Sequence, residues 1–212
     1  MKEIFSLESS IMRTLAKVTD LFLLNVLFIV TSLPIITIGA SITSLNTSWQ
    51  RMLRGNDSEI VFNYLRLFKA NFARSTLLWI GLVLFGGFFS LDFLLISQQD
   101  SPINYFGMLL LAPFVIAWLL LMSVVFAYQG RYEDQLLRSL KNSLLIALST
   151  PVQALLLIIL NVGAIYFSIS TPERLMTAIY LYTFGGFSLL ALLNSLIVKK
   201  MFQQIENRLA IG

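Results

Sequence analysis

The chain has 212 residues, of which 57% are hydrophobic and 12% are charged, and its formal net charge is +4. With a mean hydropathy of +0.81, it has too little polar surface for a water-soluble domain of this length. It contains neither cysteine nor histidine. This composition excludes disulfides, thiolate nucleophiles and histidine metal sites, and we expect no cofactor.

Five long apolar runs follow one another along the chain. Each is long enough to cross a hydrocarbon core about 30 Å thick as a helix. The predicted spans are residues 21–45, 76–97, 106–128, 144–169 and 175–198. The pattern predicts a single membrane domain over residues 1–212. Its expected fold is all-α, a polytopic transmembrane helical bundle of about five spans with short basic amphipathic helices at the interface.

The first run contains a candidate helix break. Pro34 lacks a backbone N–H, and the polar and glycine residues around it favour an interruption over residues 31–39. We expect residues 21–45 to form one straight or kinked span, which is too long for the core of a cleaved signal peptide. The alternative is a re-entrant hairpin, which would bring Arg13 and Lys17 to the same side as the next connection.

Lysine and arginine are concentrated in alternate connections. Eleven basic residues follow the first, third and fifth spans: Arg51, Arg54, Arg66, Lys69, Arg74, Arg131, Arg138, Lys141, Lys199, Lys200 and Arg208. Because cytoplasmic segments carry the excess of Lys and Arg, we expect a cytoplasmic carboxyl terminus. Five spans then place the amino terminus outside, whereas the hairpin places it inside. These cations set orientation, so the net charge does not predict a nucleic-acid partner.

Asp92, in the second predicted span, is the one charged side chain within the five runs. An intramembrane carboxylate is a candidate for binding a cation, a proton or a polar substrate. The structural alternative is that Asp92 reaches water near the outer interface. Asp20, Asn25 and Asn161 are further candidates for a polar path, although interhelical amide hydrogen bonds also serve packing and contribute about 0.6 kcal/mol each. The other amides within the spans include Gln153 and Asn194.

Two connections have the pattern of a basic amphipathic helix. Apolar residues recur at helical spacing over residues 61–72, with Arg66 and Lys69 on the polar face, and the pattern returns after the third span with Arg138 and Lys141. Such helices lie at the lipid interface with their cations toward anionic headgroups, or they dock a partner protein. We expect these four cations to form an interface of this kind.

Local features predict how helices begin and where they approach one another. Asp57 and Ser58 are suitable caps for the first amphipathic helix. The glycine pairs at residues 86–87 and 185–186 predict surfaces where two helices come close, because small residues let backbones approach.

The sequence contains no catalytic constellation, and we do not expect an enzyme. Glu133 and Asp134 form a close acidic pair, but Arg138 follows four residues after Asp134, where it pairs with that carboxylate along a helix. Carboxylate metal ligation at Asp57 and Glu59 is possible but non-specific, and no metal is predicted.

Several segments resemble the signature of the YesL family of bacterial membrane proteins. They are residues 20–25, residues 33–41 (Leu-Pro-Ile-Ile-Thr-Ile-Gly-Ala-Ser), residues 68–72 (Phe-Lys-Ala-Asn-Phe), Arg131, and residues 140–142 (Leu-Lys-Asn). The chain departs from the family at Phe126-Ala127-Tyr128, where a proline is expected after the phenylalanine.

The resemblance implies a place in the bacterial plasma membrane and, by association, a role in sugar uptake. Members of the family have no assigned activity and are commonly encoded beside carbohydrate importers of the ATP-binding-cassette class. We therefore expect an accessory or regulatory protein whose partners are the lipid bilayer and importer subunits, or a second copy of itself. The alternative is a small solute transporter with a polar path around Asp92.

Overall fold

The computed structural model describes residues 10–55, 59–97, 102–132 and 134–211. The described residues are mostly helical and include no strand, which confirms the predicted all-α fold. The elements are α1 (Ser10–Ser32), η1 (Ile35–Thr37), α2 (Ile38–Met52), α3 (Ile60–Ser97), α4 (Pro102–Tyr132), α5 (Leu136–Ser149), α6 (Pro151–Ile169), α7 (Pro172–Leu181), η2 (Tyr182–Gly186) and α8 (Phe187–Ile211).

Five stretches of the described chain are long and apolar enough to cross a membrane. They are Leu15–Ser32, Ile60–Ser97, Phe106–Tyr132, Pro151–Ile169 and Pro172–Arg208. Many of their large apolar side chains lie on the outside of the bundle; Leu84 of α3, for example, is 68% exposed. Water would disfavour so much apolar surface, and lipid accommodates it. The chain is a multi-pass membrane protein.

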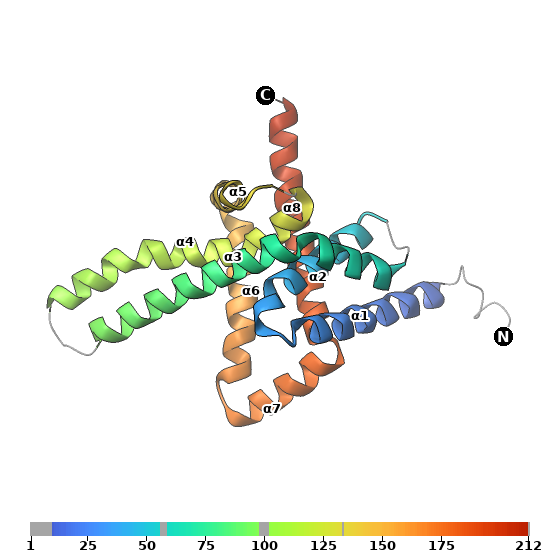
Figure 1. The fold of residues 1–212 in the computed structure, drawn as a ribbon, viewed down its shortest axis with the longest axis horizontal. Helices are drawn as coiled ribbons and strands as arrows, with labels where there is room; N and C mark the ends of the chain where they lie inside the picture. Colours follow the sequence, from blue (N-terminus) through green and yellow to red (C-terminus); the bar gives the residue numbers. More distant parts are fainter. Residues whose placement is uncertain (1–9, 56–58, 98–101, 133, 212) are drawn as a thin grey trace.

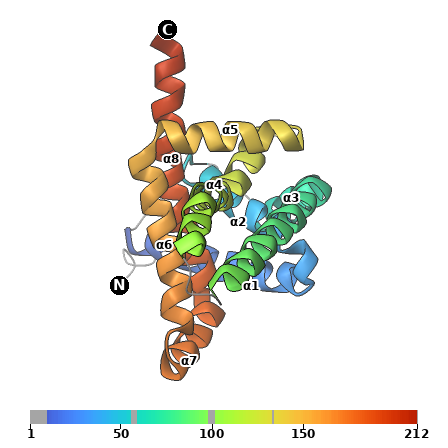
Figure 2. The same cartoon turned by 90° about the vertical axis from the view of Figure 1, so that its left-hand side faces the viewer.

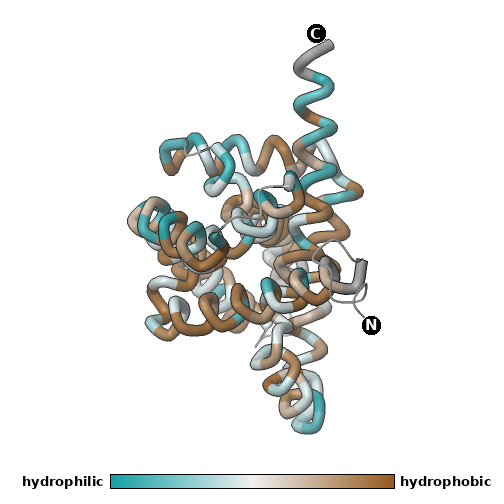
Figure 3. The backbone as a smooth tube through the Cα atoms, turned by 90° about the vertical axis from the view of Figure 1, so that its right-hand side faces the viewer, coloured by the Kyte–Doolittle hydropathy of each residue, from teal (hydrophilic) through white to brown (hydrophobic). Residues whose placement is uncertain are grey.

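The helices form two groups that cross. α3 and α4 make an antiparallel hairpin, whereas α6 and α8 run side by side and cross that hairpin steeply (Figures 1 and 2). α2 packs against α3, α4 and α8 near the centre. α5 lies across the end of the bundle from which α8 projects (Figure 2), and Figure 3 shows hydrophilic residues along that projecting part.

The first apolar run is divided into two helices. α1 ends at Ser32, Pro34 has an extended backbone (φ −75°, ψ 115°), and α2 follows after one short turn. The Thr37 hydroxyl donates to the Pro34 carbonyl (2.7 Å) within this turn. The interruption predicted over residues 31–39 is confirmed. Residues 21–45 do not form one continuous helix, because the proline ends α1, and α2 leads back toward the side on which α1 begins (Figure 1).

Most of α2 is buried although the helix is rich in serine and threonine. Its hydroxyls donate to carbonyls four residues earlier, as from Ser41 to Thr37 (3.1 Å) and from Ser44 to Ala40 (2.7 Å). These internal bonds satisfy the hydroxyl groups, so their burial carries little penalty. The helix continues to Met52, and residues expected in a connection therefore lie in the centre of the bundle.

Glycines allow the neighbouring helices to approach α2. A Cβ atom at Gly39 would lie 2.5 Å from the Cβ of Trp79 in α3. A Cβ atom at Gly130 in α4 would lie 3.1 Å from the Cβ of Thr47 and would overlap the threonine hydroxyl. Both contacts leave no room for a side chain, so the close packing of α2 depends on these glycines.

The two predicted glycine pairs have different surroundings. Gly86 lies against Trp118, whose Cζ2 would be 2.5 Å from an added Cβ, whereas nothing lies within 4 Å of a Cβ at Gly87. Gly185 meets Leu21 of α1 and has a φ of 137°, which L side chains rarely adopt. The second pair therefore also provides the conformational freedom at the break between α7 and α8.

Other predicted boundaries differ from those observed. The first amphipathic segment and the second span form one continuous helix, α3. The predicted span over residues 144–169 is divided between α5 and α6, because Pro151 starts a new helix. The span over residues 175–198 is interrupted by η2. Asp57, Ser58 and Glu133 lie outside the described residues.

Candidate functional site

A charged cluster joins α4 to the projecting part of α8. The Arg131 guanidinium forms an ion pair with Glu206 and lies 4.7 Å from the ring centre of Phe202. The Tyr132 hydroxyl donates to the same carboxylate (2.9 Å). Just beyond α2, burial and the neighbouring Arg131 lower the pKa of Arg54. Two arginines from different parts of the chain, Arg54 and Arg131, thus lie near one carboxylate.

A second polar cluster turns the chain from α4 into α5. The Tyr128 hydroxyl donates to Asp134 Oδ2 (2.6 Å) and accepts from Asn142 Nδ2 (2.8 Å). The Arg138 guanidinium lies 3.8 Å from the other carboxylate oxygen of Asp134, which confirms the predicted support along the helix. These contacts hold α5 across the end of α4.

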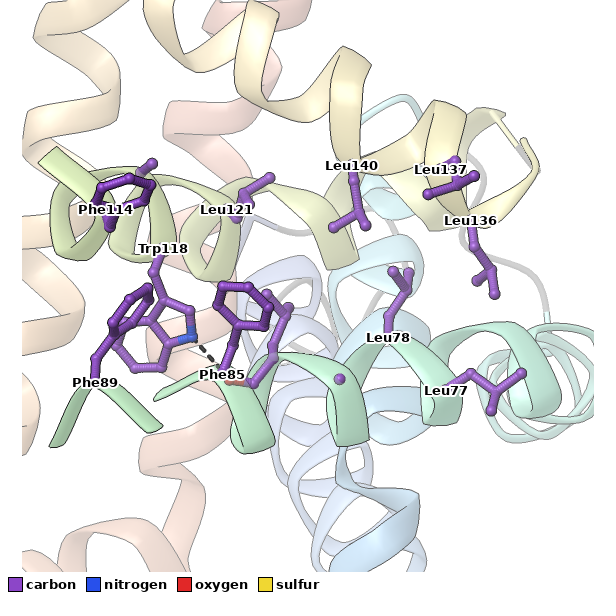
Figure 4. A pocket seen from close by; sticks show the side chains of 13 residues that line it. Leu77, Leu78, Phe85, Phe89, Phe114, Trp118, Leu121, Leu136, Leu137 and Leu140 are labelled. Atoms are coloured by element: carbon purple, nitrogen blue, oxygen red, sulfur yellow. Dashed lines mark hydrogen bonds between the residues drawn. The ribbon is translucent and has the colours of Figure 1, made fainter. Parts of the chain in front are cut away.

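An apolar groove of about 470 Å³ lies between α3, α4 and α5 (Figure 4). Phe85 of α3, Phe114 of α4 and Leu137 of α5 line it, and Leu137 is 83% exposed. The Trp118 indole N–H, which also faces the groove, donates to the Leu82 carbonyl (2.8 Å). Because that donor is already used, the groove offers an apolar surface.

The four predicted interface cations lie on two helices. Arg66 and Lys69 are exposed on the first half of α3, where Arg66 lies 4.7 Å from the ring centre of Phe62. Arg138 and Lys141 are exposed on α5, the helix that closes one side of the apolar groove. The structure therefore places two of the four on a helix that lines the apolar groove.

Asn25 is fully buried at the break between α7 and α8. Its amide nitrogen donates to the carbonyls of Tyr182 (2.9 Å) and Thr183 (3.1 Å), and its amide oxygen accepts from the Ser188 N–H (3.2 Å). These backbone groups lie where Gly185 leaves the helical conformation, so they need partners from outside the helix. Asn25 supplies those partners, which is a structural role.

Two cavities with volumes of about 370 and 350 Å³ adjoin one another. Both are lined by α2, α6 and α8; α3 and α4 also line the first, and α1 also lines the second. Asn46, Asn161 and Asn194 line both of them. Asn161 and Asn194 exchange reciprocal amide hydrogen bonds of 3.1 and 3.0 Å between α6 and α8. Asn161 thus pairs with Asn194 between two of the long apolar helices.

The two predicted carboxylates lie elsewhere. Asp92 is half-buried near the end of α3, in the hairpin with α4, and Asp20 is half-buried on α1. Neither lines the two asparagine cavities. The structure therefore does not bring the four predicted intramembrane side chains together: Asn25 closes a helix break, and Asn161 alone faces the cavities.

The sequence pattern does not single out Asn46 or Glu206. Asn46 falls just beyond the predicted end of the first span, although the run of small and hydroxyl residues from Ser41 to Ser48 continues the helix and could have placed it there. Glu206 lies far along the chain from its partner Arg131, and no local pattern indicates that pairing.

A family model matches part of the chain. Residues 21–93, about a third of the chain, match the family described as "Protein of unknown function, DUF624". The matched region runs from α1 through α2 into α3, so it includes the proline break and the buried serine and threonine residues. No curated protein and no solved structure matches the chain.

Proposed function

We propose that the chain is an accessory or regulatory component of carbohydrate uptake in the bacterial plasma membrane, where it binds a subunit of an ATP-binding-cassette sugar importer. Its resemblance to the YesL family supports this proposal, and the match of residues 21–93 covers two of the segments that carry the resemblance. The importer context itself comes from that resemblance.

The observation that carries the proposal is the apolar groove beside the basic helix α5. A groove lined by Phe85, Phe114 and Leu137 offers a packing surface to a transmembrane helix of another protein. Arg138 and Lys141 are exposed on the same helix α5, and in this proposal they make charged contacts with the partner beside the groove. A partner that spans the membrane and carries acidic residues at its cytoplasmic end would match both features.

We further propose that the basic end of the bundle faces the cytoplasm. The positive-inside rule favours that orientation for Arg131, Arg138, Lys199 and Lys200. With the hairpin of α1 and α2, we expect the amino terminus on the same side of the membrane as the carboxyl terminus. The exposed cations of α5 would lie where a cytoplasmic or interfacial part of an importer can reach them.

Co-purification from gentle detergent tests the proposal. The chain should recover importer subunits, and a photoreactive amino acid introduced in place of Leu137 should crosslink to one of them. Lys141→Glu should reduce recovery at least severalfold, because it reverses a charge at the proposed contact. Lys200→Glu makes the same reversal on α8 and should leave recovery unchanged. Crosslinks only to lipid, or only to a second copy of this chain, would contradict the importer role.

A second candidate function, a small solute transporter, is favoured by one observation. Asn46, Asn161 and Asn194 line two adjoining cavities within the helices, and such cavities are the usual place for a substrate. Asp92 lines neither cavity, so any role of its carboxylate in transport would lie outside them. Purified protein in proteoliposomes should then move a labelled solute without partners, and Asp92→Asn should reduce flux more than it reduces folded protein.

A further inference from the structure

We propose that the two asparagine cavities form one binding site for a small, neutral, hydroxyl-bearing molecule. The site lies between α2, α6 and α8, with further lining from α1, α3 and α4, and its polar contacts come mainly from Asn46, Asn161 and Asn194. The inference concerns ligand binding alone, and it holds whether the protein assists an importer or carries a solute itself.

The size and shape of the site suit a small molecule. The two cavities have volumes of about 370 and 350 Å³, and each falls within the range of roughly 300–1,000 Å³ that is typical of ligand pockets. They share Ile42 and the three asparagines as lining residues, so the amides stand at the boundary between the two spaces. A ligand that occupies either cavity therefore meets the same polar groups.

Asn46 provides an acceptor without a partner. Its side chain is only 9% exposed, and its amide nitrogen donates to the Ile42 carbonyl (3.0 Å), while its Oδ1 atom has no hydrogen bond. A buried acceptor that lacks a partner costs about 1–3 kcal/mol. The Ser32 hydroxyl, which lines one of the two cavities, is likewise buried without a partner. A ligand hydroxyl group that approaches Asn46 would give its acceptor a partner.

The asparagine pair retains capacity to bind a hydroxyl group. Asn161 and Asn194 exchange hydrogen bonds, and Asn161 also donates to the Leu157 carbonyl (2.8 Å). Each amide oxygen keeps a second lone pair, and Asn194 keeps a second N–H. A hydroxyl group both donates and accepts, so it complements this combination better than a purely donating or purely accepting group does.

The rest of the lining limits the ligand to neutral molecules. Among the described residues that line the two cavities, none carries an ionisable side chain. A charged ligand would therefore lose its hydration without gaining an opposite charge. The indole N–H groups of Trp79 and Trp118 already donate to the Ile35 (3.1 Å) and Leu82 (2.8 Å) carbonyls, so the tryptophans contribute mainly apolar surface. The ligand needs hydroxyl groups on one edge and an apolar face.

A free saccharide and the hydroxyl end of a neutral lipid share this chemistry. The test uses the full chain in nanodiscs and measures binding of labelled glucose, xylose and maltose by equilibrium methods, with gluconate and glucosamine as charged controls. Nanodiscs with and without diacylglycerol provide the lipid arm. We expect saturable binding of at least one neutral probe and none of the charged probes; saturable diacylglycerol binding would also support the site and assign it to a lipid source.

Variants connect the binding to the asparagines. Asn46→Leu should weaken binding of the neutral probe at least tenfold, while its melting temperature should stay the same or rise, because the substitution removes an unsatisfied acceptor. Gln153→Leu removes another membrane amide, which pairs with Gln204 (3.0 Å) and lines neither cavity, and it should leave binding unchanged. The proposal fails if no neutral probe binds, if a charged probe binds as well as a neutral one, or if folded Asn46→Leu binds like the unsubstituted chain.

Discussion

Single amide and guanidinium side chains hold distant parts of this bundle together. Asn25 reaches from α1 to three backbone groups around the break between α7 and α8. Arg131 reaches from α4 to Glu206 and Phe202 of α8. Asn25 lies among apolar helices, where no water replaces a lost partner, so its contacts decide whether the irregular backbone at that break is tolerated.

Replacing Asn25 by leucine should destabilise the protein by about 1–3 kcal/mol. The substitution removes the side-chain partner of the Tyr182 and Thr183 carbonyls and of the Ser188 N–H. Each hydrogen bond between helices in a membrane contributes about 0.6 kcal/mol on average, and a buried group left without a partner costs about 1–3 kcal/mol. Unfolding in mixed micelles would give the free energy, and hydrogen exchange should increase around residues 182–188. Equal stability and unchanged exchange would show that the break does not need Asn25.

Arg131→Ala should destabilise the fold by about 1–3 kcal/mol, because it removes both the ion pair with Glu206 and the contact with Phe202. The Arg131 side chain is 15% exposed, whereas that of Arg138, which pairs with Asp134 at 3.8 Å, is 65% exposed. Arg138→Ala is therefore the control and should cost about 0.5 kcal/mol or less. Similar losses in the two variants, measured by the same unfolding assay, would argue against a special role for Arg131.

At the scale of the element, α2 shows how a polar helix can occupy the centre of a membrane protein. Its hydroxyls bond to its own carbonyls, and its small side chains admit α3 and α4. Gly39 and Gly130 extend this close contact to the neighbouring helices. Packing of α2 therefore depends on glycines at these contacts as well as on its small side chains.

The glycine contact predicts a sharp difference between two identical substitutions. Gly39→Ala would place a Cβ 2.5 Å from the Trp79 Cβ and should destabilise the protein by at least about 1–3 kcal/mol, the usual cost of overpacking. Gly163→Ala lies in α6 with nothing within 4 Å and should be neutral or stabilising by up to about 1 kcal/mol, the difference in helix propensity. Thermal unfolding of the two variants checks this; equal melting temperatures would contradict the close contact.

For the whole molecule, the hairpin of α1 and α2 leads us to expect one particular arrangement in the membrane. α2 returns toward the side from which α1 starts, so the amino-terminal end, the connection after α2 and the basic end of α8 are expected on one side of the membrane. The connection between α6 and α7 lies at the opposite end of α6 (Figure 1).

Because the chain has no cysteine, single cysteines can report this topology directly. With a membrane-impermeant thiol reagent, Ser170→Cys should react in intact cells, whereas Lys2→Cys, Arg54→Cys and Lys200→Cys should react only after permeabilisation. The expected contrast follows from the hairpin and the positive-inside rule. If Lys2→Cys reacts in intact cells and Arg54→Cys does not, the first run crosses the membrane once and the hairpin arrangement is wrong.

Much of the fold could be predicted from the sequence, because each helix that crosses a membrane must by itself be long enough and apolar enough to do so. The apolar runs are helical in the structure, as predicted, and Pro34 marks the break within the first run. The errors concern continuity: α3 joins two segments that were expected to be separate, and Pro151 divides a run that was expected to be one. Hydropathy indicates whether a segment lies in lipid or in water, but it does not indicate where one helix ends and the next begins.

Some residues of the candidate sites could be predicted from the sequence, and others could not. The amphipathic pattern correctly places Arg138 and Lys141 on an exposed helix, and an intramembrane asparagine such as Asn161 stands out against apolar neighbours. The boundary between span and connection hides Asn46, because serine and threonine lower the hydropathy of a helix whose hydroxyls are satisfied internally. No local pattern could pair Arg131 with Glu206, since that contact joins residues 75 positions apart.

The amino-acid sequence by itself determined that this protein is helical and lives in a membrane, because those properties follow from the polarity of consecutive residues. Only the tertiary structure decided that α2 turns back and is buried, that Asn25 serves a helix break, and that three asparagines surround common cavities. These outcomes depend on which helix faces meet across long stretches of chain, and that information is spread over residues whose individual patterns give no sign of it.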